Sequence, residues 1–160
     1  MHSSIVKLSS KGRYAVRALF DIAFYNDGQP TQVRDIAERQ GIPQRFLEQI
    51  FQDLKRAAIV GSKRGPQGGY LLAKPANEIR LGEVVQVIEG PVALGENTSS
   101  SPTRSEGVTQ DAQRATDAVF LEISGHIQEC LDAVTVADIC NKAAALGIRR
   151  PGTEGYMYSI

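Results

Sequence analysis

The chain has 160 residues, which suits one domain or one domain with an added arm. A content of 42 % hydrophobic and 22 % charged residues is ordinary for a soluble globular protein. The net charge of +0 is unevenly distributed, because residues 1–75 hold 12 of the 18 Lys and Arg but 6 of the 18 Asp and Glu (12 − 6 = +6), which leaves −6 for residues 76–160. This asymmetry favours contact between the first half and a polyanion, although chance surface variation gives the same pattern.

The amino-terminal stretch predicts a cytoplasmic protein. No apolar core follows the charges of MHSSIVKLSSKGRY, so we expect no signal peptide, and no apolar run is long enough to cross a membrane. Two cysteines without a secretory signal favour a reducing compartment.

Three helices are predicted first along the chain. The first begins at Ser9 or Ser10, either of which can cap it, and ends in the turn NDGQP at residues 26–30. The second is expected to be capped by Thr31 and to stop at Gly41, and the third to begin around Pro43. Helical spacing predicts these inner faces: Ala15, Ala18, Leu19, Ile22 and Ala23; Val33, Ile36 and Ala37; and Phe46, Leu47, Ile50 and Leu54.

Two short helices joined through a glycine turn, the second with a polar outer face, are typical of a helix-turn-helix, although any small antiparallel helix pair shares the pattern. The segments AAIV (57–60) and YLLA (70–73) are predicted strands, with SKRGPQGGY (62–70) as the hairpin tip between them. This combination predicts a winged helix. The glycines would let the backbone turn and come close to a phosphate or a groove wall. A nucleotide-phosphate loop is not predicted, because the sequence has neither G-x-x-x-x-G-K-[ST] nor G-x-G-x-x-G.

The second half is predicted to be mainly helical. IRLGEVVQVIEGP forms a helix that ends at Gly90, and GENTSSSPTRSEG (95–107) is expected to be a mobile loop. A long helix follows from about residue 110 to about residue 133, and Thr135 caps a last short helix. The long helix needs a partner for its apolar stripe, which consists of Ala115, Ala118, Val119, Ile123, Ile127, Leu131 and Val134. Packing on its own domain is one solution, and a two-fold dimer is favoured.

Four segments together resemble the Rrf-two family of bacterial winged-helix repressors: LSSKGRYAVRALFDIA, IAERQGIPQRFLEQIFQDLKRAAIV, RGPQGGYLLAKP and IRLGEVVQVIEGP. The resemblance covers about the first 90 residues closely and the long helix more loosely. It implies a mainly α fold with a small β-hairpin wing. The implied organisation is a DNA-binding domain at 1–92, a flexible loop at 93–109, and a dimerisation helix and tail at 110–160.

The resemblance also implies homodimers that bind double-stranded operator DNA through the third helix and the wing. Arg and Gln can bond base edges two at a time, and Glu48 would accept from a cytosine amino group or hold a neighbouring cation. Arg64 is a candidate for minor-groove insertion, and Lys11 and Lys63 are expected near phosphates. Solvation is the alternative role for each side chain. The predicted DNA-binding residues are Lys11, Gln44, Arg45, Glu48, Gln49, Lys63, Arg64 and Gly65, and the predicted dimer interface is Val119, Ile123, Ile127 and Leu131.

Many members of the family hold an iron–sulfur cluster with three cysteines just after the EGP segment. Residues 92–114 contain no cysteine and no histidine, so we expect neither a cluster nor another cofactor or metal. Cys130 lies in the stripe of the long helix and Cys140 in the last helix, and both are predicted to be small buried hydrophobes, with a redox role as the alternative. His126 is four residues before Cys130, and a structural role is favoured over ligation.

A cluster-free branch of the family, which includes the repressor of cysteine metabolism, shares the cysteine-free loop and an ending of the YMYSI type. This resemblance implies capture of the tail, through Ile160 and Tyr158, by O-acetylserine sulfhydrylase. The alternative is a terminal strand that packs on its own dimer.

The sequence thus predicts a cytoplasmic, homodimeric transcriptional repressor, and the resemblance implies cysteine and sulfur metabolism genes as its targets. The alternatives are a redox- or metal-responsive repressor and a regulatory partner of a metabolic enzyme. Catalysis has least support, because no nucleophile–base pair, carboxylate dyad or metal motif is present.

Overall fold

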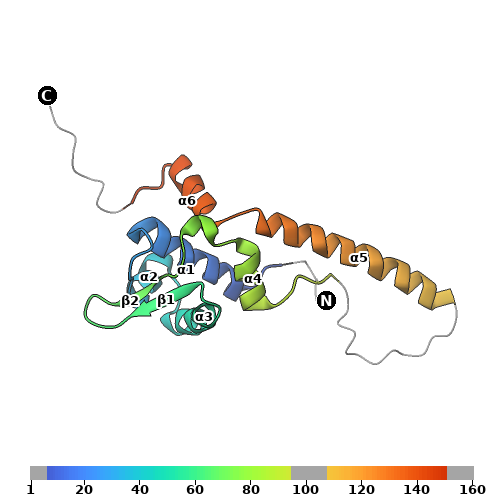
Figure 1. Ribbon diagram of the computed structural model, residues 1–160, viewed down its shortest axis with the longest axis horizontal. Coiled ribbons are helices and arrows are strands. Elements are labelled where there is room, and N and C mark those ends of the chain that lie inside the picture. The colour runs from blue at the N-terminus through green and yellow to red at the C-terminus, as the bar shows by residue number, and fades with distance from the viewer. Residues whose placement is uncertain (1–6, 95–107, 151–160) are drawn as a thin grey trace.

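Six α-helices and one two-stranded hairpin form the part of the chain that the computed structural model describes, residues 7–94 and 108–150 (Figure 1). The expected mainly helical fold with a hairpin wing is confirmed. Helix α5 extends away from the other elements as a long arm, and α6 lies against the first helix. The elements in chain order are α1 (Ser10–Asn26), α2 (Val33–Gln40), α3 (Gln44–Arg56), β1 (Val60–Lys63), β2 (Gly69–Leu72), the 3₁₀ helix η1 (Ala76–Glu78), α4 (Leu81–Glu89), α5 (Val108–Asp132) and α6 (Val136–Ala145).

Local capping signals set the ends of several helices as predicted. The Ser9 hydroxyl accepts a hydrogen bond from the backbone N–H of Gly12 at 3.1 Å and caps α1. Gly41 adopts φ 61° after the last residue of α2, a conformation that glycine reaches without strain. Thr135 caps α6 in a capping box, in which its hydroxyl accepts from the N–H of Asp138 and the Asp138 carboxylate accepts from the N–H of Thr135.

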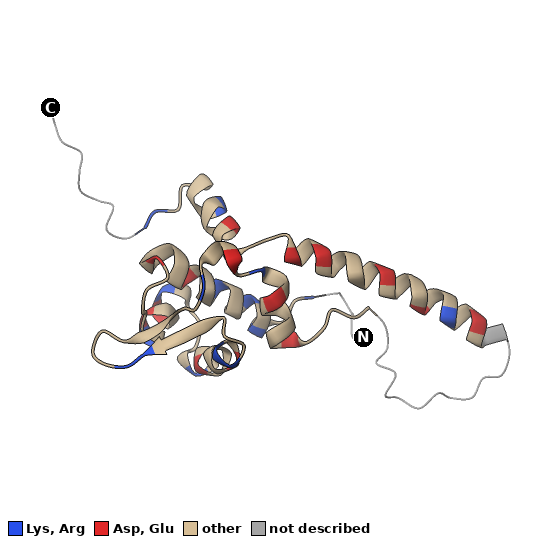
Figure 2. Cartoon of the chain, in the orientation of Figure 1, with Lys and Arg blue, Asp and Glu red and all other residues tan. Residues whose placement is uncertain are grey.

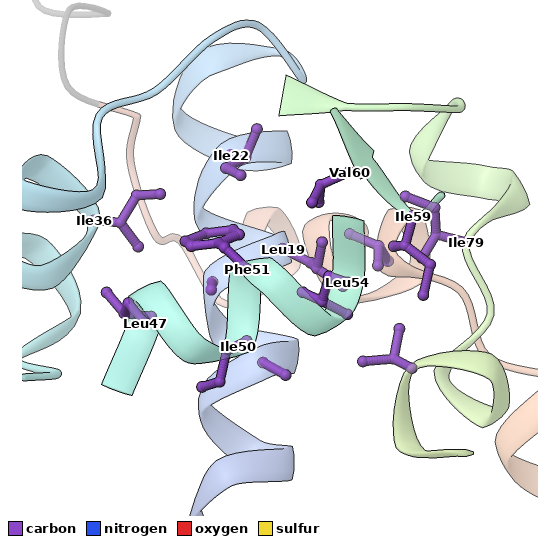
Figure 3. Packing of buried hydrophobic residues seen from close by; sticks show 14 of the residues in the cluster. Leu19, Ile22, Ile36, Leu47, Ile50, Phe51, Leu54, Ile59, Val60 and Ile79 are labelled. Atoms are coloured by element: carbon purple, nitrogen blue, oxygen red, sulfur yellow. The ribbon is translucent and has the colours of Figure 1, made fainter. Parts of the chain in front are cut away.

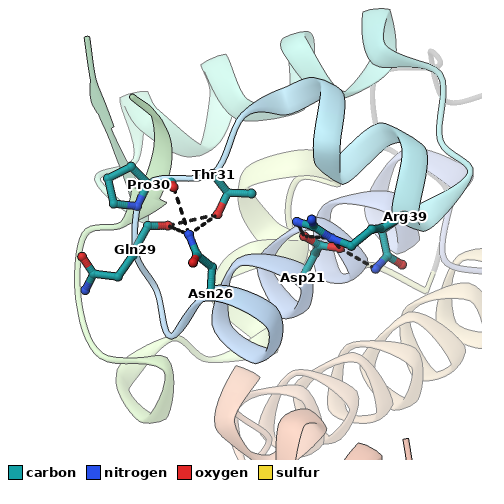
Figure 4. Close-up of polar contacts among 7 residues, drawn as sticks. Asp21, Asn26, Gln29, Pro30, Thr31 and Arg39 are labelled. Carbon is teal, nitrogen blue, oxygen red and sulfur yellow. Dashed lines mark hydrogen bonds and ion pairs between the residues drawn. The ribbon is translucent and has the colours of Figure 1, made fainter. Parts of the chain in front are cut away.

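Thr31 does not cap α2, contrary to the sequence prediction. The N-cap position belongs to Gln32, whose side chain makes no capping hydrogen bond. Thr31 instead pairs with Tyr70 of the hairpin through two backbone hydrogen bonds of 2.8 and 2.9 Å. Its hydroxyl donates to the carbonyl of Gln29 and accepts from Asn26 Nδ2, so the turn already uses the group that would cap the helix (Figure 4).

The core lies between α1, α3 and the hairpin (Figure 3), and its largest fully buried side chain is Phe51. Phe51 stacks on Tyr70 of β2, with ring centroids 4.3 Å apart. The prediction that Phe46 points inward is wrong, because Phe46 is 51 % exposed. The buried stripe of α3 has the complete i, i+3, i+4, i+7 spacing without it, through Leu47, Ile50, Phe51 and Leu54.

The hairpin is shorter and begins later than predicted. Strand β1 pairs antiparallel with β2, from Val60 opposite Leu72 to Lys63 opposite Gly69. The predicted first strand, residues 57–60, therefore overlaps β1 only at its end, because Ala57 and Ala58 form the turn after α3 and Ala58 adopts φ 57°. The tip is residues 64–68.

Within the described residues helix α5 contacts the rest of the chain through its second half, where the buried Ser124 hydroxyl accepts a hydrogen bond of 2.9 Å from the N–H of Leu94. The carbonyl of Val134, just after the helix, accepts from the N–H of Leu81, and a Cβ atom at Gly82 would overlap the Asp132 carboxylate. Every described side chain from residue 110 to residue 123 is exposed. Among the described residues no helix combines the length and the apolar character needed to cross a membrane. Most of the predicted loop at 93–109, namely residues 95–107, lies outside the described residues, as does the tail that holds Tyr158 and Ile160.

Candidate DNA interface

The four predicted base-contacting residues lie together on the exposed side of α3. Gln44, Arg45, Glu48 and Gln49 are all exposed, and they occupy the first turns of the helix. Gln44 Nε2 donates to Glu48 Oε1 at 3.0 Å, so Glu48 orients a neighbouring amide rather than a cation. Within the described residues the side chains of Arg45 and Gln49 have no hydrogen-bond or ion-pair partner. They are therefore free to bond to a ligand surface.

The polar face continues to the end of α3 and meets the wing. Arg56 lies on the same stripe as Arg45 and Gln49, two helical turns beyond Gln49, and its side chain is 75 % exposed. Sequence reasoning missed Arg56, although its spacing from Arg45 would have placed it on the same face. Lys55 Nζ donates to the Ser62 hydroxyl at 2.6 Å, which links the last turn of α3 to β1. Helix face and hairpin thus form one continuous surface.

The wing carries its cations at an exposed tip. Lys63 and Arg64 are exposed, and in the described part of the chain neither side chain has a partner. Gly65 adopts φ 111°, and a Cβ atom there would meet no atom within 4 Å. Figure 2 shows Lys and Arg on the hairpin and on α3, whereas Asp and Glu predominate on α5.

The other two wing glycines, Gly68 and Gly69, make close contacts with the protein's own backbone. A Cβ atom at Gly68 would overlap the carbonyl oxygen of Lys63, and one at Gly69 would overlap the carbonyl oxygen of Thr31. Gly68 and Gly69 therefore serve the turn that the sequence predicts, and the approach of the wing backbone to a phosphate stays a prediction. They let the hairpin close and pack on the segment before α2. Gln32 Nε2 adds a hydrogen bond of 3.2 Å to the carbonyl of Pro66 at the tip.

Lys11 lies beside α3, but it is not a free cation. Its Nζ is 2.9 Å from Asp53 Oδ2 on α3, and its side chain is 40 % exposed. Arg56 Nη1 lies 3.2 Å from the other oxygen of the same carboxylate. The cluster of Lys11, Asp53 and Arg56 therefore carries a net charge of one, where two isolated cations would carry two.

A buried ion pair sets the position of α2 (Figure 4). The Asp21 side chain is 0 % exposed on α1, and Arg39 of α2 binds it through Nη2 at 2.6 Å and Nε at 3.1 Å. Gln40 Nε2 donates to the same carboxylate at 2.8 Å. The hydrogen bond to Asp21 raises the pKa of Arg39. Because three donors meet one buried carboxylate, α2 is held against α1, and α3 follows it directly through the Gly41 turn.

The predicted dimer residues divide into two groups. Val119 and Ile123 are 53 % and 39 % exposed, whereas Ile127 and Leu131 are half-buried against the same chain. Phe120 and Leu121 are exposed as well, at 44 % and 74 %. The outer half of α5 thus presents apolar side chains that nothing in the described chain covers.

Within the described residues the cysteines and the histidine do not lie together at one point. Cys130 is exposed, contrary to the prediction, and Cys140 is half-buried, with burial raising the pKa of its thiol. His126 is exposed on α5. No group of three or more His, Cys, Asp or Glu converges within the described residues. Of the two cysteines and two histidines in the full sequence, His2 lies outside the described residues, and the other three do not come together.

Comparison with known proteins identifies the family. The model of the Rrf2 (Rrf-two) family, described as iron-dependent transcriptional regulators, matches residues 8–142. The HTH-type transcriptional regulators IscR of Cronobacter sakazakii and of Escherichia coli are each 35 % identical over 144 residues, which is 89 % of this chain and 85 % of theirs.

Two solved structures extend the similarity to the whole fold. CymR of B. subtilis, described as the global cysteine regulator, superposes with a TM-score of 0.69 at 28 % identity over 86 % of this chain and 98 % of its own. IscR of T. potens superposes with a TM-score of 0.67 at 33 % identity over 99 % of this chain and 100 % of its own. The residue-level motifs, the family match and the shared architecture agree. The chain belongs to the Rrf2 family of winged helix-turn-helix, DNA-binding transcriptional regulators.

Proposed function

We propose that the chain is a homodimeric repressor that binds a palindromic operator through α3 and the wing. The observation that carries this proposal is the continuous surface formed by the α3 face and the hairpin. On that surface Arg45, Gln49, Lys63 and Arg64 have no partner among the described residues. Unpaired guanidinium and amide groups on a helix surface are suited to bidentate bonds with guanine and adenine edges in the major groove.

The two parts of the surface contribute differently to recognition. Arg45 and Gln49 on α3 supply sequence specificity, with Gln44 oriented by Glu48. Arg64 at the wing tip enters the minor groove, and Lys63 contacts a phosphate. The phosphate contacts contribute affinity that does not depend on sequence and that falls steeply with salt.

Dimerisation through α5 supplies the second DNA-binding domain. Val119, Phe120 and Ile123 are exposed on a helix of 25 residues that projects from its domain, and an uncovered helix of this kind needs a partner surface. A second copy provides the same stripe by two-fold symmetry. The two α3 helices would then meet half-sites separated by about one or more helical turns, roughly 34–36 Å each. Such binding represses a gene when the operator overlaps its promoter.

The test uses operators selected in vitro from random duplexes, with affinity measured by fluorescence anisotropy. Arg45→Ala should weaken binding by about 5- to 150-fold, the range of one bidentate base contact, and should relax specificity at one position. Arg114→Ala, which removes an exposed guanidinium from α5, is the matched control and should leave affinity unchanged. Equal affinities for wild type and Arg45→Ala would exclude α3 as the reading helix.

We further propose that the regulated genes belong to cysteine or sulfur metabolism and that no cluster is sensed. The cysteine-free segment 92–114 supports this, because three thiolates cannot be supplied there. The similarity to CymR, whose description names it a cysteine regulator, supports the same pathway. In this proposal O-acetylserine sulfhydrylase binds the tail that ends in Tyr158 and Ile160.

A pull-down from native extract tests the tail, using protein tagged at its amino terminus with and without Ile160. Capture of the sulfhydrylase only by the intact chain is the expected result. If neither form captures it, the enzyme-partner proposal is wrong, and Cys130, which is exposed on α5, becomes the residue to examine for the alternative of a redox-responsive repressor.

A further inference from the structure

Phe46 is an exposed aromatic side chain on the helix that is proposed to read DNA. It is 51 % exposed, and the other large exposed hydrophobic side chains of the described chain lie on α5, on α6 or in the segments that border α6. Among the described residues 7–94, Phe46 is therefore the one large hydrophobic side chain that is exposed. Single exposed hydrophobic side chains are common on protein surfaces, so it is the position of Phe46 on α3, and not its exposure alone, that carries the inference.

The position of Phe46 places it among the proposed base-contacting residues. It is the third residue of α3, directly after Arg45, and it lies three residues before Gln49, so Phe46 and Gln49 are neighbours on the helix surface. Residues in the first turns of a recognition helix are those that contact base edges. The described chain gives the Phe46 ring no aromatic or cationic partner, and the core stripe of α3 is complete without it.

An apolar side chain in a major groove has one complementary group, the C5-methyl of thymine, because the other groups at the base edges are hydrogen-bond donors and acceptors. We propose that Phe46 is a specificity-determining residue that reads thymine methyl groups in each operator half-site. This inference rests on the proposed role of α3 in the major groove. It adds an apolar contact to a surface otherwise built from amides and charges.

The test is a double-mutant cycle between protein and DNA. Each thymine of the selected operator is replaced in turn by deoxyuridine, which removes only the methyl group, and binding is measured by anisotropy for wild type and for Phe46→Ala. We expect at least one position per half-site where methyl removal weakens the wild type by about fourfold, the effect of one buried methyl group. At that position Phe46→Ala should bind thymine and uracil duplexes equally. Phe46→Leu should keep part of the methyl effect.

One control variant and three outcomes separate this inference from its alternatives. Leu146→Ala removes a side chain that is 69 % exposed, on the residue that ends α6, and should retain the full methyl effect. If Phe46→Ala weakens binding but every methyl effect persists, Phe46 contacts the sugar–phosphate backbone and the inference is wrong. If Phe46→Ala dissociates a dimer in sedimentation, Phe46 belongs to a protein interface, and the inference is again wrong. Loss of sequence-specific binding in Arg45→Ala with no methyl effect in wild type leaves the proposed function standing and overturns this inference alone.

Discussion

Removal of the Asp53 charge should strengthen DNA binding and make it more sensitive to salt. Asp53 pairs with Lys11 at 2.9 Å and with Arg56 at 3.2 Å, beside the proposed reading face. Asp53→Asn keeps the side-chain size and raises the charge of this cluster from one to two in each subunit. Since both pairs are partly exposed, the loss of folding stability should stay below about 1–2 kcal/mol.

The size of the effect follows from counterion release. One extra effective phosphate contact per subunit gives two per dimer, so the slope of log K against log[salt] should steepen by about 1.8. If the two proteins bind equally at about 1 M salt, this slope makes Asp53→Asn bind about 60-fold more tightly at about 0.1 M salt, which is the largest effect expected. Anisotropy titrations between roughly 50 and 200 mM salt measure both the slope and the affinity.

The matched control for Asp53 is Glu78→Gln, which removes an exposed carboxylate on η1, an element outside α3 and the wing. It should change neither the slope nor the affinity at moderate salt. An unchanged or shallower slope for Asp53→Asn, with the fold intact by circular dichroism, would refute the idea that Lys11 and Arg56 face phosphates.

Three further predictions concern the scaffold that positions this surface. Arg39→Ala should lower the free energy of unfolding in urea by about 2–4 kcal/mol, because it leaves the buried Asp21 carboxylate with only an amide donor; adding Asp21→Ala should recover part of this loss. Gly69→Ala should cost about 2–4 kcal/mol through overlap with backbone at φ 144°, whereas Gly65→Ala, with open space around it, should cost about half as much. Hydrogen bonds from the α6 cap lower the pKa of Asp138. Its contribution to folding stability should therefore be complete above the ordinary carboxyl pKa and should be lost as the pH falls through the lowered pKa of the folded state. An NMR titration in which this carboxyl shows an unshifted pKa would contradict the capping box.

Hydrophobic spacing and capping signals were sufficient for most helices, because both are properties of a few consecutive residues. The inner face of α1, the caps Ser9 and Thr135, and the stop at Gly41 are examples. The wing was also predictable, since a basic, glycine-rich stretch between two short apolar runs is typical of a hairpin tip that contacts nucleic acid. The motifs of the first 90 residues were specific enough to indicate the family, which the comparisons confirm.

The assignments that failed depend on contacts between segments that are distant along the chain. A threonine before a helix has the local pattern of a cap, but Thr31 is paired with Tyr70 of the wing. Phe46 and Phe51 are equally apolar, and the helical spacing of α3 leaves Phe46 off the buried stripe, but only the folded chain places Phe51 against Tyr70 of β2. Strand β1 begins late because the chain must first turn through Ala58.

The residues alone were enough to indicate a winged helix-turn-helix regulator, an exposed polar face on α3 and a segment, residues 92–114, without cysteine or histidine. Each of these follows from residue type and local order. Which charges pair with one another, and which glycines are required by close backbone contacts, could be identified only in the folded chain. Asp53 neutralises Lys11, and Gly69 packs under Thr31, because α1, α3 and the wing meet in space. Pairings of this kind are set by which elements lie side by side, and no local pattern in the sequence records them.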